Sequence, residues 1–307
     1  MSLQLGFVST GAGPSPAPVT ALADHRRTDG EVLLTRVEQR MALLVSTTTR
    51  SAAQLAALHH LRAGGGRFRA RLAIDAGLAL GIAPDHIESV AAAVELVHNA
   101  SLIHDDLQDR DEVRRGRPAV WVDFGDAVAV SAGDLMLSAA YGALASSGSA
   151  AAVLIERLHR RIGELIRGQD ADLSGPAQHL TLADYENIAA GKSGPLLILP
   201  VEMSLALADL ETSQTTAAAC GRHFAIGYQM FDDLRDVAID RSGGALNAVL
   251  VLARSGHHDP EGQVTERAVQ HFDQAESLSR SLPAGSGRLL AEAARKLRRQ
   301  LTGETRT

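Results

Sequence analysis

Apolar residues recur three and four positions apart along most of the chain, the spacing that gathers side chains on one face of an α-helix. Clusters of Gly, Pro and Ser separate these periodic segments and mark the expected connections. No segment keeps the alternation of apolar and polar residues that is typical of a half-buried strand. The pattern predicts an all-α protein with helices over residues 32–44, 52–61, 69–80, 84–104, 124–144, 150–168, 182–210, 212–236, 246–254, 263–282 and 287–301.

The first part of the chain departs from this pattern. Residues 1–25 are rich in Gly, Pro, Ser and Thr and show no helical period, so we expect a flexible N-terminal tail. No linker of similar composition divides the remainder. Residues 26–307 are therefore predicted to form a single domain, and a chain of 307 residues is long enough to bury a large core.

Composition narrows the fold and excludes one class of partner. Aromatic residues make up 3% of the chain although 45% is hydrophobic, which favours helices packed through small side chains over a strand-rich fold. The formal net charge of -6 does not provide the basic field that nucleic-acid binding needs. We therefore expect no nucleic acid among the partners of this protein.

Nothing in the sequence points to an oxidising compartment or to a membrane. The lone cysteine, Cys220, cannot close an internal disulfide. The longest apolar stretches, such as Leu196–Leu210, are interrupted by residues such as Pro200 and Glu202, so we expect no membrane span. Residues 1–20 lack a basic segment followed by an apolar core, which excludes a secretory signal. These features together predict a cytoplasmic protein.

The same pattern of three aspartates occurs twice, at 105–109 and 232–236, each time at the C-terminal end of a long apolar helix. The first and last aspartates of each copy are four residues apart, so a helix places both carboxylates on one face. Such a pair is costly unless water or a cation screens it, and hard oxygen ligands select Mg²⁺ or Ca²⁺. A single copy is equally well explained as a solvated helix end. The repetition favours two halves of one site that holds Mg²⁺ around a diphosphate.

Candidate anion-binding residues lie near the first motif. The basic turn Arg114–Pro118 follows it, and guanidinium groups bind phosphate oxygens bidentately. His98 precedes Asp105 by two helical turns on the same face, although a buried core histidine is the alternative explanation. Earlier, the glycine turn Gly64–Arg69 leads into a helix start with two arginines, a geometry that suits an anion.

A further cation stands out because lysine is rare. Lys192 is one of only two lysines in the chain, and Ser193 follows it just before Pro195. The spacing around this pair excludes a P-loop. An ammonium and a hydroxyl at a helix kink nevertheless indicate a phosphate clasp, with an ordinary surface lysine as the alternative.

These motifs, taken in order, resemble the trans-isoprenyl diphosphate synthase family, also called polyprenyl synthetases. The resemblance implies an isoprenoid synthase type helical bundle with a deep central cavity between the two aspartate motifs, usually assembled as a homodimer. It rests on Gly64–Arg69, His98, His104–Asp109, Arg114–Pro118, Lys192, Ser193 and Tyr228–Asp236.

The resemblance also implies roles for individual residues and a requirement for up to three Mg²⁺ ions. The ligands of Mg²⁺ on the allylic diphosphate would be Asp105, Asp109 and Asp232, supported directly or through water by Asp106, Asp233 and Asp236. The residues that hold the allylic diphosphate would be Arg114, Lys192, Ser193 and Gln229. Isopentenyl diphosphate would be held by Arg69, His98 and Arg115. The catalytic set would be Asp105, Asp109, Arg114, Lys192 and Asp232.

The chain departs from the family pattern at the glycine turn, where the usual lysine is Gly66. Arg67 is the expected substitute for this lysine on isopentenyl diphosphate. The loop after the second motif also lacks the usual further lysines, with Arg241 as the candidate replacement. Each lost charge-assisted hydrogen bond would weaken substrate binding by roughly 1.5–3 kcal/mol. The loss affects the site for isopentenyl diphosphate more than the site for the allylic diphosphate.

The implied activity is the condensation of isopentenyl diphosphate with dimethylallyl, geranyl or farnesyl diphosphate to a longer all-trans prenyl diphosphate. A bulky aromatic residue just before the first motif would stop short products in this family, and none is present. We therefore predict a C20 product and a chain-length pocket formed by Val97, Ala100 and Ser101. Two alternatives stay open. The lost lysines suit an enzyme that ionises a prenyl diphosphate for cyclisation or for transfer to another acceptor, and a non-catalytic subunit of a heteromeric synthase is the other.

Overall fold

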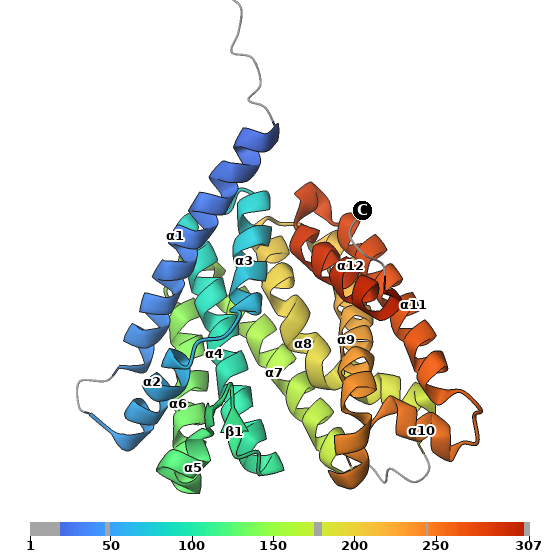
Figure 1. Cartoon of the computed structure of the whole chain (residues 1–307). Helices are drawn as coiled ribbons and strands as arrows, with labels where there is room; N and C mark the ends of the chain where they lie inside the picture. The colour runs from blue at the N-terminus through green and yellow to red at the C-terminus, as the bar shows by residue number, and fades with distance from the viewer. Residues whose placement is uncertain (1–18, 47–49, 175–179, 244, 304–307) are drawn as a thin grey trace, which may run out of the picture.

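A computed structural model of the chain describes residues 19–46, 50–174, 180–243 and 245–303 (Figure 1). The longer elements are α1 (Val19–Val45), α2 (Ala52–Arg62), α3 (Phe68–Ala79), α4 (Pro84–Asp109), β1 (Val113–Arg114), β2 (Arg117–Pro118), α5 (Val120–Phe124), α6 (Asp126–Ala145), α7 (Ala151–Ser174), α8 (Leu182–Leu207), α9 (Gln214–Gly243), α10 (Ala248–Arg254), α11 (Pro260–Arg280) and α12 (Arg288–Thr302). Short 3-10 helices occupy Gly148–Ala150, Glu211–Ser213 and Pro283–Gly285. The prediction of an all-α protein is confirmed, and each predicted range coincides with one helix or, for 124–144, with two.

The structure differs from the expectation at the N-terminus and after the first motif. Helix α1 begins at Val19, inside the stretch 1–25 that the sequence analysis assigned to a tail, while residues 1–18 lie outside the described part. The basic turn forms a short antiparallel hairpin in which Val113 pairs with Pro118. Two residues per strand are too few to leave a period in the sequence.

Helix ends follow the usual capping chemistry. At the start of α8, the Thr181 hydroxyl accepts from the backbone N–H of Asp184, whose carboxylate accepts in turn from the Thr181 N–H. Pro84 occupies the first turn of α4, where the missing N–H costs nothing. These signals fix where α4 and α8 begin, and hence where the residues near their functional ends lie.

Helix α4 is the centre of the larger core. Its residues from Ile87 to Val97 are buried, and they pack against α6, α3 and α1. The run Ala91–Ala93 lets neighbouring helices approach closely, which is the packing that the low aromatic content indicated. A second core joins α8, α9, α11 and α12. In Figure 1, α4 and α9 both run downward and end at the lower side of the molecule, where the hairpin and α10 lie.

The expectation that the chain has no membrane span stays a prediction. Among the described residues, α6 is long and apolar enough to cross a membrane, with a mean hydropathy of 1.4 over its most apolar window. The sequence analysis did not single it out because Gly133 and Asp134 interrupt the apolar run. Length and composition alone do not show a span, and 44% of that window is buried against the rest of the protein. The buried part of α6 packs on α4 and α2.

Candidate active site

The first aspartate motif closes α4, and its three carboxylates have different surroundings. Asp109 is the last helical residue and is exposed, Asp105 is half-buried, and Asp106 lies on the opposite face and is fully buried. The helix ends at Arg110, whose φ of 57° is left-handed. The pair that the four-residue spacing singled out, Asp105 and Asp109, therefore shares the accessible face.

The hairpin after α4 explains why Asp106 is buried. It folds back so that the Arg114 Nε donates to the Asp106 carboxylate at 2.7 Å, and a second guanidinium nitrogen forms an ion pair with the same oxygen. Arg114 also lies 3.3 Å from the Asp111 carboxylate. Arg114 thus anchors the end of the motif, and its assignment to the allylic diphosphate stays a prediction.

The second motif repeats this arrangement on α9. Asp236 is exposed and Asp232 is half-buried, whereas Asp233 is buried. The Asp233 carboxylate accepts from the backbone N–H of Ala248 at 2.7 Å, and the Asn247 side chain donates to the Asp233 carbonyl at 2.9 Å. Asp233 therefore fixes the start of α10 in the way that Asp106 fixes the hairpin.

The middle aspartates hold neighbouring elements in place. The sequence analysis gave Asp106 and Asp233 a supporting role beside the Mg²⁺ ligands, directly or through water, and this stays a prediction; both carboxylates are buried in the structure. Burial raises the pKa of Asp233 to about 7, although the Ala248 N–H opposes that rise. The spacing of the motif could not separate the three positions, because the hairpin and α10 that cover the middle one come later in the chain.

The carboxylates on the accessible faces are partly buried, and those within one motif repel each other. Burial raises the pKa of Asp105 to about 6; the Asp109 charge adds to this rise and Lys192 opposes it. Burial also raises the pKa of Asp109 and of Asp232, and the Asp236 charge contributes at the latter. The raised pKa values show that the charged carboxylates are disfavoured here, and a bound cation would stabilise them.

Lys192 reaches the first motif because two helices touch at glycines. A Cβ built on Gly168 of α7 would lie 2.3 Å from the carbonyl carbon of Gly191 on α8, so only glycine permits this approach. One turn beyond Gly168, the Asp172 carboxylate accepts from the Lys192 Nζ at 2.5 Å. Burial would lower the pKa of Lys192, but Asp172 and the Asp109 and Asp105 charges outweigh it and raise that pKa. Lys192 is therefore a cation that faces the first motif.

Two further contacts close this wall of the site. Ser193 donates to the side chain of Gln229 on α9 at 3.5 Å, so two residues predicted to hold the allylic diphosphate are neighbours. On α7, Gln169 donates to Gln108 at 3.3 Å. Neither Gln169 nor Asp172 was singled out from the sequence. The sequence signal that could have identified them is their spacing, since Gln169 and Asp172 lie three residues apart near the end of the amphipathic helix α7.

A cluster of cations and neutral histidines lies beside the first motif. His98 is partly buried, and burial together with Arg69 and Arg115 holds its pKa well below the usual range. A guanidinium nitrogen of Arg115 donates to the Gly64 carbonyl, and the guanidinium group covers Gly65 so closely that a Cβ there would clash. The structure thus brings the glycine turn, His98 and the hairpin together, as the family resemblance implied.

The structure adds a residue of α2 to this cluster. His60 is buried with its Nε2 unpartnered, and burial, then Arg115 and Arg114, lower its pKa to about 4. Its position next to His59 on an apolar helix gave no functional signal in the sequence, and its approach to His98 depends on how α2 packs.

Arg67, the expected substitute for the missing lysine, has other partners. It is buried at the start of α3, its Nε donates to Glu38 at 3.0 Å, and another nitrogen donates to the Leu61 carbonyl at 2.7 Å. Gly66 faces open space, with nothing within 4 Å of the position that a Cβ would take. The contact with isopentenyl diphosphate predicted for Arg67 stays untested, and the position of the usual lysine leaves a gap.

The residues proposed for the chain-length pocket differ in burial. Val97 and Ala100 are fully buried within the α4 core, whereas Ser101 is partly exposed and donates to the His98 carbonyl at 2.9 Å. Of the three, Ser101 has room for a larger side chain.

The carboxylates of the two motifs are the candidate ligands of Mg²⁺. Among the described residues, no three His, Cys, Asp or Glu side chains converge on one point as a complete metal site would require. Mg²⁺ commonly takes only one or two carboxylates and completes its shell with water and phosphate oxygens. Two exposed pairs, Asp105 with Asp109 and Asp232 with Asp236, fit an ion that arrives with a diphosphate.

The pattern of the polyprenyl synthetase family matches residues 51–243, which hold both motifs and every cation described above. This chain belongs to the polyprenyl synthetase family. A (2E,6E)-farnesyl diphosphate synthase of Mycobacterium tuberculosis is 40% identical over 173 residues, which cover 55% of this chain and 48% of that protein. A geranylgeranyl diphosphate synthase of Methanosarcina mazei is 33% identical over 221 residues, covering 70% and 66%. The chain therefore spans about half the length of the first of these relatives.

Solved structures confirm the fold. The geranylgeranyl pyrophosphate synthetase of the archaeon Geoglobus acetivorans superposes with a TM-score of 0.77 at 24% identity, over 89% of this chain and 98% of that one. The isoprenoid synthase type bundle predicted from the resemblance is thus the fold of this polyprenyl synthetase.

Proposed function

We propose that this polyprenyl synthetase is a trans-prenyltransferase that condenses isopentenyl diphosphate with an allylic diphosphate. The observation that carries the proposal is the accessible pair of each motif at the same end of the bundle, beside Lys192 and the cluster of His98, Arg69 and Arg115. That arrangement offers one region for a metal-bound diphosphate and another for a metal-free one. Relatives named as farnesyl and geranylgeranyl diphosphate synthases support the same reaction class.

Each group has a distinct task in this reaction. Asp105, Asp109 and Asp232 would hold Mg²⁺, which would supply positive charge to the diphosphate leaving group. Lys192 would give that diphosphate a direct charge-assisted hydrogen bond. The apolar wall of α4 keeps water from the allylic cation, and His98 with Arg69 and Arg115 orients isopentenyl diphosphate for attack.

Steady-state assays with Mg²⁺, isopentenyl diphosphate and each of the three allylic primers test the proposal. We expect longer diphosphates whose formation stops with EDTA. Absence of elongation with every primer would exclude this function. The matched variant Lys192→Met should retain the fold and lose at least tenfold in kcat/KM for the allylic substrate, because one charge-assisted bond is removed.

One observation favours the second candidate, an enzyme that ionises a prenyl diphosphate without isopentenyl diphosphate. Gly66 leaves the family's lysine position empty, and Arg67 is engaged by Glu38. Incubation with the allylic diphosphate alone separates elongation from ionisation and cyclisation, since only the second candidate consumes it and releases diphosphate with an alcohol or a hydrocarbon. Transfer to another acceptor is tested by adding that acceptor in place of isopentenyl diphosphate. In a true elongating enzyme, Gly66→Lys should lower KM for isopentenyl diphosphate and leave KM for the allylic substrate unchanged.

The product proposed for the elongating enzyme is C20. Ser101→Phe should shorten the product because a ring at this partly exposed position would close the chain-length pocket proposed beside α4. Ser101→Ala removes the hydroxyl without adding bulk and should leave the product unchanged. Chromatography of the products measures their length. An unchanged length in Ser101→Phe would mean that a residue on another helix limits the product.

A further inference from the structure

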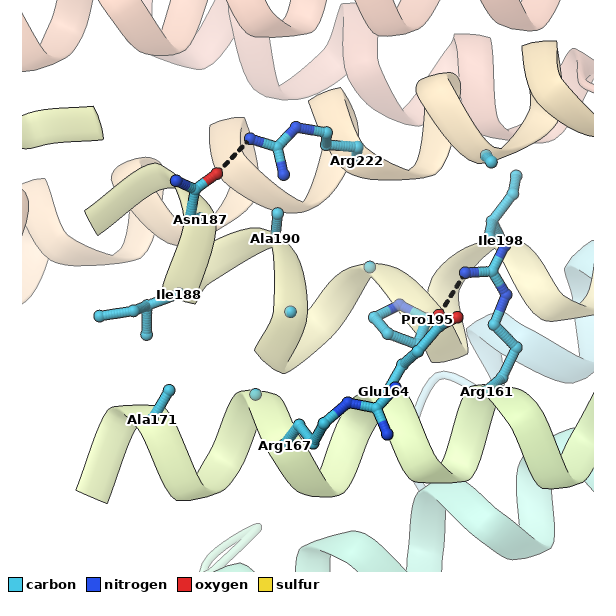
Figure 2. A pocket seen from close by; sticks show the side chains of 14 residues that line it. Arg161, Glu164, Arg167, Ala171, Asn187, Ile188, Ala190, Pro195, Ile198 and Arg222 are labelled. Atoms are coloured by element: carbon cyan, nitrogen blue, oxygen red, sulfur yellow. Dashed lines mark hydrogen bonds and ion pairs between the residues drawn. The ribbon is translucent and has the colours of Figure 1, made fainter. Parts of the chain in front are cut away.

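A groove of about 500 Å³ lies between α7 and α9, with α8 as its floor (Figure 2). None of its lining residues belongs to the aspartate motifs or to the cluster around His98. The volume falls within the range of small-molecule sites, about 300–1,000 Å³. It is therefore a concavity apart from the site described above.

Small residues on α8 let α7 and α9 pack closely against it on either side of the groove. The backbones of α7 and α8 touch where Gly168 meets Gly191, and a Cβ on Gly194 would lie 3.6 Å from the Ala225 Cβ of α9. Pro195 lacks an N–H, so the helical hydrogen bond to the Gly191 carbonyl is missing. The floor is thus small-sided and apolar, with Ile198 at one end of it (Figure 2).

The walls supply more positive than negative charge. Arg161 is neutralised by Glu164 and Glu202. Arg167 on α7 and Arg222 on α9 come from opposite walls, as Figure 2 shows, and among the described residues neither has a carboxylate partner.

One of these arginines is already held in place. Arg222 donates to the Asn187 side-chain oxygen at 2.8 Å, which fixes its guanidinium, and its other N–H groups have no hydrogen-bond partner among the residues that the structure describes. The Asn187 amide adds two more donors. The groove therefore offers donors and positive charge above an apolar floor.

We propose that this groove binds an amphipathic phosphate ester, with the phosphate between Arg167 and Arg222 and the apolar part on Ile188 and Ala218, which line the groove and are partly exposed. Guanidinium groups from two walls match the spread oxygens of a phosphate or diphosphate. The choice of a prenyl diphosphate as that ester rests on the proposed function. Because Gly191 lines the groove and Lys192 next to it faces the first motif, such a ligand would lie against the back of the catalytic wall.

Calorimetric titration with geranyl S-thiolodiphosphate, a diphosphate ester that resists ionisation, tests the proposal. In EDTA we expect two sites per chain, the groove and the metal-free diphosphate region around His98, and with Mg²⁺ we expect a third. Inorganic diphosphate should bind the groove at least tenfold more weakly, since it lacks the apolar part. No binding in EDTA would overturn the proposal, and so would equal affinity for both probes.

Variants assign one metal-independent site to the groove. The double variant Arg167→Ala with Arg222→Ala should lose one of the two metal-independent sites and keep the metal-dependent one. Arg160→Ala removes an exposed arginine of α7 that does not line the groove, and should keep all three. Two metal-independent sites in the double variant would overturn the proposal. Loss of only the metal-dependent site in the parent protein would instead count against the proposed function.

Discussion

At the scale of single residues, the adjacent aspartates Asp105 and Asp106 are expected to have different roles. Asp105→Ala should reduce kcat/KM at least a hundredfold with little loss of stability, because it removes a proposed metal ligand from the accessible face. Asp106→Ala should lower the free energy of unfolding by about 1–3 kcal/mol, because it leaves Arg114 without its buried partner. Denaturant titration and steady-state kinetics on both variants check this contrast. Equal stability of the two variants would contradict it.

The pKa of Asp105 predicts how Mg²⁺ affinity depends on pH. Burial raises that pKa to about 6, so the carboxylate is charged above this value and protonated below it. A metal ligand must be deprotonated, and affinity for Mg²⁺ with a diphosphate analogue should therefore fall as pH drops from 7.5 to 5.5. Titrations across this range measure the fall, and Asp105→Asn should flatten it. A pH-independent affinity in the parent protein would contradict the assignment.

At the scale of elements, the contact of α7 with α8 depends on the lack of a side chain at one position. Gly168→Ala would place its Cβ against backbone atoms of Gly191, so we expect a loss of about 1–3 kcal/mol in stability together with reduced activity. Gly163→Ala is the matched control on α7. Its Cβ meets only the tip of Arg167, at 3.5 Å, and the change should be neutral or stabilising by about 0.5–1 kcal/mol. Thermal unfolding of both variants decides.

The elements also show how far the sequence could be interpreted. Hydrophobic period and the Gly, Pro and Ser clusters were sufficient for every helix except the first half of α1, because these signals are local. The accessible pairs of both motifs followed from the four-residue spacing on a helix. Asp172 and His60 escaped notice because their helices approach the motifs only through tertiary packing, at the Gly168 contact and beneath the hairpin. The burial of Asp106 depends on Arg114, eight residues later and in another element.

At the scale of the whole molecule, α6 has an apolar surface that the chain itself does not cover. Less than half of its apolar window is buried, and Val130 is 44% exposed. Such a face suits a contact between copies of the chain, and family members usually form homodimers. We expect light scattering to give twice the chain mass of 32.3 kDa, and Val130→Arg to shift the protein towards the monomer. A monomeric parent protein would contradict this expectation.

The ion pair of Lys192 with Asp172 has a practical consequence for chemistry on this protein. A carbodiimide activates a carboxylate, and an amine at 2.5 Å captures it as an amide without any spacer. Lysine is so rare in the chain that a cross-link between a peptide of α7 and one of α8 would identify the pair directly in a mass spectrum. A diphosphate that draws Lys192 away would protect against that cross-link. The yield of one covalent bond would then measure substrate occupancy without following the reaction.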